Sequence, residues 1–111
     1  MSRQPFAHDA VLEMDAGADD RAPGGAITVA LCGSSAHQPP CPLAPHHTAA
    51  QRAGAQLRLR VLFAAEPDDE ARVRALIDGA LADGDGWRLA ITAPSEVRPV
   101  ERAHAERLTR S

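Results

Sequence analysis

A strand, a helix and a second strand follow one another between residues 56 and 92, and this succession constrains the fold more than any other part of the sequence. Apolar and polar residues alternate over 56–64 and again over 87–92, which predicts two strands that each bury one face. Between them, apolar residues recur at helical spacing after an acidic, proline-containing start, and Gly84 ends the pattern. Such a unit favours parallel strands joined by a right-handed crossover.

Weaker patterns complete the expected domain. Residues 10–14 and 27–32 are interpreted as strands joined by a turn rich in Asp, Pro and Gly. A short helical turn is expected over 49–53 and a terminal helix over 99–108. We therefore expect an α+β fold, a two-layer sandwich in which a mixed sheet of about four strands, in the order β-β-loop-β-α-β-α, carries two helices on one face.

The length of 111 residues fits one domain whose core needs no disulfide. We expect residues 1–8 to form a flexible N-terminus and residues 9–109 to form a single domain with a Cys-, His- and Pro-rich loop at 32–48. The chain has no apolar run approaching the roughly 18 residues of a membrane span and no signal-peptide pattern, so a cytoplasmic protein is expected. Arginine supplies all 12 basic residues, a bias typical of GC-rich bacterial coding.

The segment from Cys32 to His47 holds both cysteines and three of the five histidines. Two sulfurs and two nitrogens are the usual ligands of a tetrahedral zinc ion, and Cu(I) is the alternative metal. The spacing Cys-x4-His-x3-Cys-x4-His departs from the paired knuckles of zinc fingers, so the pattern is less specific than a double CxxC. The candidate ligands are Cys32, His37, Cys41, His46 and His47.

The adjacent residues His46 and His47 are not expected to bind one ion together, because neighbouring side chains diverge in a strand and in a helix. Cys32 ends an expected strand on the side turned away from the core, where a thiol is accessible to a ligand or an oxidant. A disulfide between Cys32 and Cys41, and a proline-rich loop whose ligand-type residues have no joint role, are alternatives that remain open at this point.

These residues predict a small metal-binding domain with a structural, sensing or partner-recognition role. A metal-free interaction module is the alternative, because Arg58, Arg60 and Arg88 fall on the sheet face opposite the expected core and suit a homodimer or an acidic protein partner. Nucleic acid is not expected as a partner, because the formal net charge is -3 and both Phe63 and Trp87 fall on the core side of their strands.

The sequence does not favour an enzyme. It contains no G-x-S-x-G, P-loop, G-x-G-x-x-G or H-E-x-x-H motif. A reactive thiol or a metal-bound water in the Cys/His loop is the remaining catalytic alternative. His8 falls in the expected flexible terminus, and His104 falls near the apolar side of the terminal helix, where an ordinary packed histidine is expected.

Overall fold

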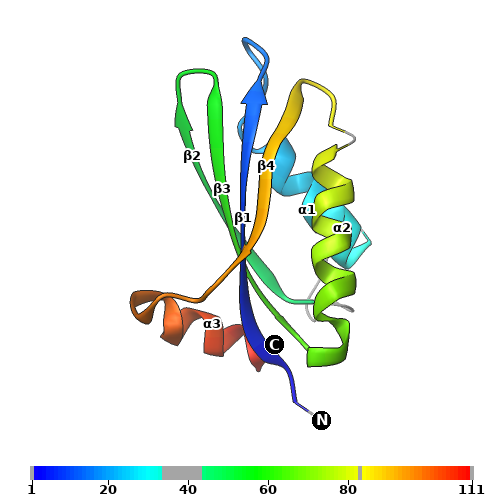
Figure 1. Cartoon of the computed structure of the whole chain (residues 1–111), viewed down its shortest axis with the longest axis vertical. Helices are drawn as coiled ribbons and strands as arrows, with labels where there is room; N and C mark the ends of the chain where they lie inside the picture. The colour runs from blue at the N-terminus through cyan, green and yellow to red at the C-terminus, as the bar shows by residue number, and fades with distance from the viewer. Residues whose placement is uncertain (1, 34–43, 83, 111) are drawn as a thin grey trace.

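The computed structural model describes residues 2–33, 44–82 and 84–110 and arranges them as a four-stranded sheet with three α-helices (Figure 1). Short 3-10 turns at Pro67–Asp69 and Pro99–Glu101 precede the second and third helices. The strands are β1 (Gln4–Met14), β2 (His46–Ala53), β3 (Gln56–Ala65) and β4 (Trp87–Ser95), and the helices are α1 (Ala22–Cys32), α2 (Glu70–Ala82) and α3 (Arg102–Thr109).

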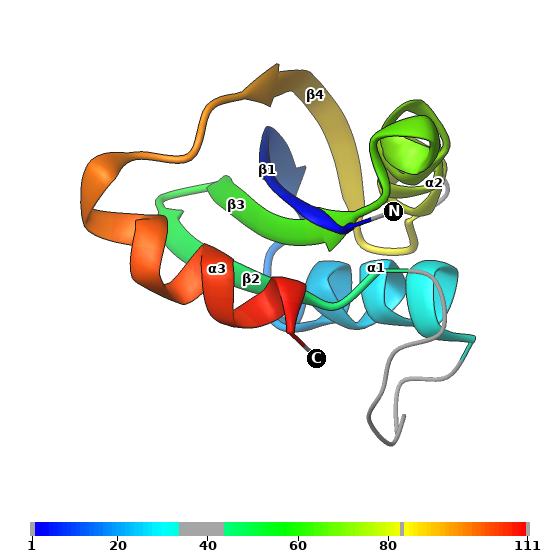
Figure 2. The same cartoon turned by 90° about the horizontal axis from the view of Figure 1, so that it is seen from below.

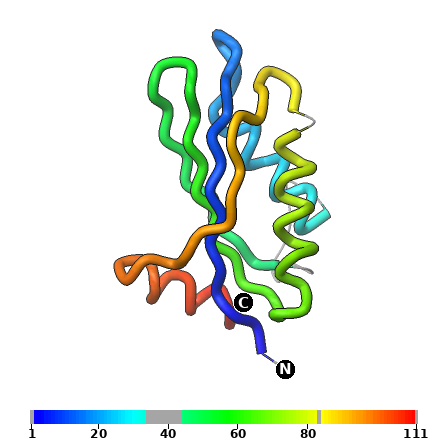
Figure 3. The backbone as a smooth tube through the Cα atoms, viewed as in Figure 1, coloured from blue at the N-terminus to red at the C-terminus, as the bar shows by residue number. Residues whose placement is uncertain are grey.

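The strand β1 occupies the middle of the sheet (Figure 3). It pairs antiparallel with β3 on one side and with β4 on the other, and β2 pairs with the outer edge of β3, so the strand order is β2-β3-β1-β4. The expected α+β sandwich of about four strands is confirmed. The strands β3 and β4 run parallel to each other, as predicted, but β1 lies between them and is antiparallel to both. The pairings in the described residues are therefore all antiparallel, and the predicted mixed sheet is wrong. The elements follow the β-α-β-β-α-β order of split β-α-β domains.

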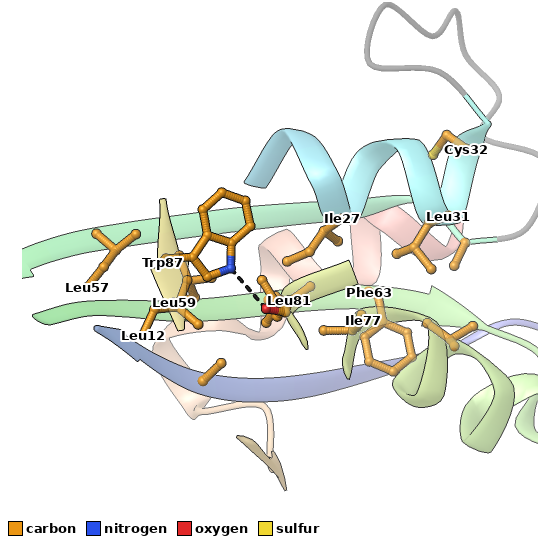
Figure 4. Close-up of a cluster of buried hydrophobic side chains, with 14 of the residues drawn as sticks. Leu12, Ile27, Leu31, Cys32, Leu57, Leu59, Phe63, Ile77, Leu81 and Trp87 are labelled. Carbon is orange, nitrogen blue, oxygen red and sulfur yellow. Dashed lines mark hydrogen bonds between the residues drawn. The ribbon is translucent and has the colours of Figure 1, made fainter. Parts of the chain in front are cut away.

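One face of the sheet is covered by α1 and α2 (Figures 1 and 2). The alternation over β3 correctly predicted which of its residues are buried against these helices. The indole of Trp87 reaches the end of α2, where its Nε1 donates to the Leu81 carbonyl at 2.9 Å (Figure 4). The centre of this core contains Leu12, Ile27, Leu31, Leu57, Leu59, Phe63, Ile77 and Leu81.

The third helix lies on the opposite face, against β1 and β3 (Figure 2). Two helices share one face, as expected, but they are α1 and α2, and the terminal helix predicted there is on the other side. Its Ala105 is fully buried, as is Ala7 of β1. The side chain of Arg60 fixes this arrangement because it donates to both carboxylate oxygens of Glu101, each at 2.7 Å, just before α3 begins.

Residues 27–32 form the last part of α1, and the strand predicted there is wrong. The segment from Ala22 to Cys32 is almost entirely apolar, so its apolar residues fit the period of a strand and that of a helix. The buried residues Pro23, Ile27 and Leu31 recur every four positions, which is the spacing of one helical face. Pro23 in the first turn and Gly33 in the left-handed conformation at the end, with φ of 80°, are the local signals of a helix.

Two further segments differ from the sequence-based expectation. Residues 49–53, expected as a helical turn, belong to β2, and Gly54, with φ of 62°, lies in the turn between β2 and β3. The first strand begins at Gln4 and not at Ala10, so that residues 4–8, expected within a flexible terminus, pair with β3. In both cases pairing with β3 determines the conformation of a segment whose local signal is weak.

Gly84 is a position where a side chain has no room. A Cβ atom there would overlap the Trp87 indole, which is held by its bond to Leu81 and is only 8% exposed. Replacing Gly84 with Ala is expected to lower the free energy of unfolding by about 1–3 kcal/mol through overpacking. Urea unfolding followed by the fluorescence of Trp87, the single tryptophan, measures this change.

A matched control is the replacement of Gly79 with Ala inside α2. A Cβ at Gly79 meets no atom within 4 Å, so this variant is expected to be neutral or more stable by up to about 1 kcal/mol. Equal stability of the two alanine variants would contradict the steric role assigned to Gly84.

Candidate functional site

The end of α1 and the start of β2 bring two of the predicted ligands together. Cys32 is the last residue of α1 and His46 is the first residue of β2, and Cys32 Sγ lies 3.8 Å from His46 Nδ1. Ligands bound tetrahedrally to one zinc ion, at about 2.3 Å for sulfur and about 2.1 Å for nitrogen, are about 3.6 Å apart. The two side chains therefore have a separation that suits chelation of one metal ion.

Cys32 is disulfide-bonded in the structure, so its sulfur is not a thiolate in this state. The sequence left this possibility open. The side chain is 8% exposed and belongs to the core cluster, whereas an accessible side chain was expected. The other cysteine of the sequence, Cys41, and the candidate ligand His37 lie outside the described residues.

The imidazole of His46 is held between its own strand and α1. Its Nδ1 lies 3.1 Å from the Ala44 carbonyl, and its Nε2 lies 3.0 Å from the Thr28 hydroxyl. Because a carbonyl oxygen only accepts hydrogen bonds, Nδ1 carries a proton in this state, and the Thr28 hydroxyl proton is shared between Nε2 and a second acceptor. The same hydroxyl lies 3.2 Å from the Gly24 carbonyl, one helical turn earlier.

His47 points to the other face of the sheet. In the register of β2 and β3, His46 is paired with Phe63 and His47 with Leu62, so their side chains diverge as expected for neighbours in a strand. The ring of His47 packs against that of His104 in α3, with 4.7 Å between the ring centroids. Of the two adjacent histidines, only His46 shares a site with Cys32.

Cys32 and His46 are two ligands of a set that is not complete within the described residues. Across residues 2–33, 44–82 and 84–110, no group of three His, Cys, Asp or Glu side chains is arranged to hold a metal ion. A hollow of about 440 Å³ lies beside His46 and is lined in part by Gly24, Thr28 and Thr48. It gives the surroundings of the His46 ring access to solvent.

His8 is a buried polar residue that sequence reasoning missed. Its side chain is 2% exposed, and both ring nitrogens have partners. Arg74 Nη1 lies 3.0 Å from Nδ1, while Nε2 lies 2.7 Å from the Thr92 hydroxyl and 3.1 Å from an Asp78 oxygen. Because a guanidinium only donates, Nδ1 accepts and Nε2 carries the proton. The apolar alternation of β1 continues through Phe6, and this was the available signal that His8 faces the core.

The three arginines predicted on one face do lie opposite α1 and α2, but their surroundings differ. Arg60 is 13% exposed and is bonded to Asp9 at 2.8 Å and to Glu101 at 2.7 Å. The hydrogen bonds from Arg60 lower the pKa of Glu101 to about 2. Arg58 and Arg88 are exposed. Arg60 therefore stabilises the fold, and of the three arginines only Arg58 and Arg88 are exposed to solvent.

Comparisons with protein-family models, with curated proteins and with solved structures found no match to the chain. Within the part of the chain that the structure describes, no α-helix is long and apolar enough to cross a membrane. By fold and site, the chain forms an α+β domain that carries a cysteine and histidine pair where α1 ends and β2 begins.

The unfolding free energy is expected to decrease between pH 7 and pH 5. Burial lowers the pKa of His8 below its ordinary value of 6.5, and partial burial together with His47 and Arg107 lowers the pKa of His104. The unfolded chain therefore takes up these protons first, and stability is lost as the pH falls below about 6.5. Urea titrations at several pH values measure this loss, and an NMR titration midpoint of His8 at or above 6.5 would contradict it.

Proposed function

We propose that this domain binds a transition-metal ion, zinc in the first place, through Cys32 and His46, and that thiol-disulfide exchange at Cys32 controls the binding. The separation of 3.8 Å between Cys32 Sγ and His46 Nδ1 is the observation that supports the proposal. Of the structural, sensing and partner-recognition roles, sensing is favoured, because a ligand that also forms a disulfide links metal binding to the redox state.

Metal binding requires reduction of the disulfide at Cys32. A dithiol reductant supplies two electrons and two protons, the S–S bond breaks, two thiols form, and the reductant becomes a disulfide. The Cys32 thiol then loses its proton as the metal binds, so metal uptake releases protons. Exchange with an oxidised disulfide compound, which accepts two electrons and becomes two thiols, re-forms the S–S bond at Cys32, removes the thiolate ligand and releases the metal. In the cytoplasm, the compartment predicted from the sequence, the reduced form would bind the metal.

The proposed ligand set differs in one member from the set predicted from the sequence. His37 and Cys41 remain proposed as further ligands, and Cu(I) remains the alternative metal because thiolate and imidazole ligands suit it as well. His47 is left out because its ring packs against His104 on the other face of the sheet. The proposal therefore assigns His46 as a metal ligand and excludes its neighbour His47.

The two histidines provide a matched pair of variants for the main test. The reduced, untagged protein is expected to bind about one equivalent of zinc with thiolate coordination. Replacing His46 with Ala is expected to weaken zinc binding by about 100-fold or more through loss of a ligand, and replacing His47 with Ala is expected to leave it unchanged. Competition with a chromophoric chelator measures the affinity, and Co²⁺ absorption reports the thiolate.

The redox part of the proposal has its own control. The oxidised protein is expected to bind no zinc, and addition of a dithiol reductant is expected to restore binding. Equal affinities of the oxidised and reduced forms would contradict control by the disulfide. Equal losses in the His46 and His47 variants would contradict the assigned ligand.

A second candidate function, a protein-interaction module, is supported by the open sheet face. A hollow of about 630 Å³ lies on this face and is lined in part by Val11, Gln51, Arg58 and Arg98. Ile91 in β4 is on the same side and is 61% exposed, an unusual degree for a large apolar residue in a strand. The partner is a second copy of the chain or an acidic protein.

Reversal of charge at Arg58 tests the second candidate. If the face joins two copies, the protein is expected to sediment as a dimer and the variant with Arg58 replaced by Glu as a monomer. The exposed residue Arg72, which lies in α2 on the covered side of the sheet, provides a matched charge-reversal control. Dimers in both variants would show that Arg58 is not at the interface.

A further inference from the structure

We infer that Thr28 is a positioning residue of the proposed metal site, because its hydroxyl holds the His46 imidazole with Nδ1 toward Cys32. This inference rests on the proposed function. Thr28 Oγ1 lies 3.0 Å from His46 Nε2, while Nδ1 on the other side of the ring lies 3.8 Å from Cys32 Sγ. The ring orientation therefore decides which nitrogen is presented to a metal ion.

The helix provides both contacts to the ring from one side. Thr28 and Cys32 are four residues apart in α1, so they lie on the same face of the helix, separated by about 6 Å along its axis. The imidazole of His46 spans this gap from the first position of β2. A shift of the ring by one rotamer would break the contact to Thr28 and turn Nδ1 away from Cys32.

The Thr28 hydroxyl also provides a hydrogen-bond partner for Nε2–H when a metal ion takes the place of the proton on Nδ1. In the metal-free state Nδ1 carries the proton, because it faces the Ala44 carbonyl at 3.1 Å. A metal ion bound to Nδ1 requires the neutral ring to carry its proton on Nε2. That N–H then donates to Thr28 Oγ1, and the Thr28 hydroxyl donates to the Gly24 carbonyl at 3.2 Å.

Metal-ligating histidines usually have such a partner on the second nitrogen, and its removal typically weakens metal binding by about 10–100-fold. Thr28 can satisfy this role in both states, because a hydroxyl is a donor and an acceptor. In the metal-free state its proton is shared between Nε2 and the Gly24 carbonyl, and in the metal-bound state the hydroxyl accepts from Nε2 and donates to Gly24. Valine at this position keeps the branched shape but offers neither function.

Three variants separate positioning from packing. Replacing Thr28 with Val is expected to weaken zinc binding of the reduced protein by about 10–100-fold, and replacing it with Ser is expected to restore affinity to within a few-fold of the parent. Thr48 is the matched control, because its Oγ1 is buried in β2 without a hydrogen-bond partner in the described structure. Its replacement with Val is expected to leave zinc affinity unchanged.

A second measurement does not depend on metal. Long-range ¹H–¹⁵N spectra of the metal-free protein are expected to show the Nδ1–H form of His46 in the parent and in the Thr28→Ser variant. In Thr28→Val a mixture of both tautomers is expected, because the ring is no longer held with Nδ1 against the Ala44 carbonyl. Parent-like tautomer and zinc affinity in Thr28→Val would overturn this inference alone. A reduced parent protein that binds no zinc would overturn the proposed function, while the tautomer comparison still decides the role of Thr28 in holding the ring.

Discussion

The pairing of β1 with strands on both sides is the constraint on which the rest of the structure depends. Its even-numbered side chains lie on the side of the sheet that α1 and α2 cover, and its odd-numbered side chains lie on the opposite side, part of which α3 covers. The adjacent residues His8 and Asp9 therefore begin two separate polar networks. His8 contacts Arg74 and Asp78 of α2, whereas Asp9 contacts Arg60, which holds the residue before α3. One strand thus connects the helices of both layers.

These two networks explain why buried polar groups are compatible with so small a core. His8 is neutral and hydrogen-bonded at both nitrogens, and Arg60 directs its donors to two carboxylates, the Ser95 hydroxyl and the Glu96 carbonyl. A buried charge is costly unless it is paired in this way. The frame formed by β1, β3 and α2 is therefore held by apolar packing in the centre and by charged hydrogen bonds at its borders.

The candidate site lies beside the frame, between the end of α1 and the start of β2. Cys32 terminates α1 and His46 opens β2, an edge strand, so the two residues are positioned by elements that pack on the frame from one side. The pleat of β2 then assigns His46 to this site and His47 to the α3 face. A metal ion bound at Cys32 and His46 would join the end of α1 to the edge of the sheet, and a disulfide at Cys32 would prevent that connection.

The sequence by itself determined the positions of β3, α2, β4 and α3, because alternation, helical spacing and terminal residues are local signals. In β4 the alternation placed Ile91 on the buried face, which is wrong, because the register of β1 and β4 shifts between Val11 and Leu12 and Ile91 is exposed on the opposite face. It also located the ligand-type residues between Cys32 and His47. Only the tertiary structure decided that α1 is a helix, since its apolar residues fit two periods. Pairing decided the course of β2, the burial of His8 and the side on which α3 lies. The tertiary structure also decided the approach of Cys32 to His46, because it depends on a contact between α1 and β2 that the local sequence of neither segment predicts.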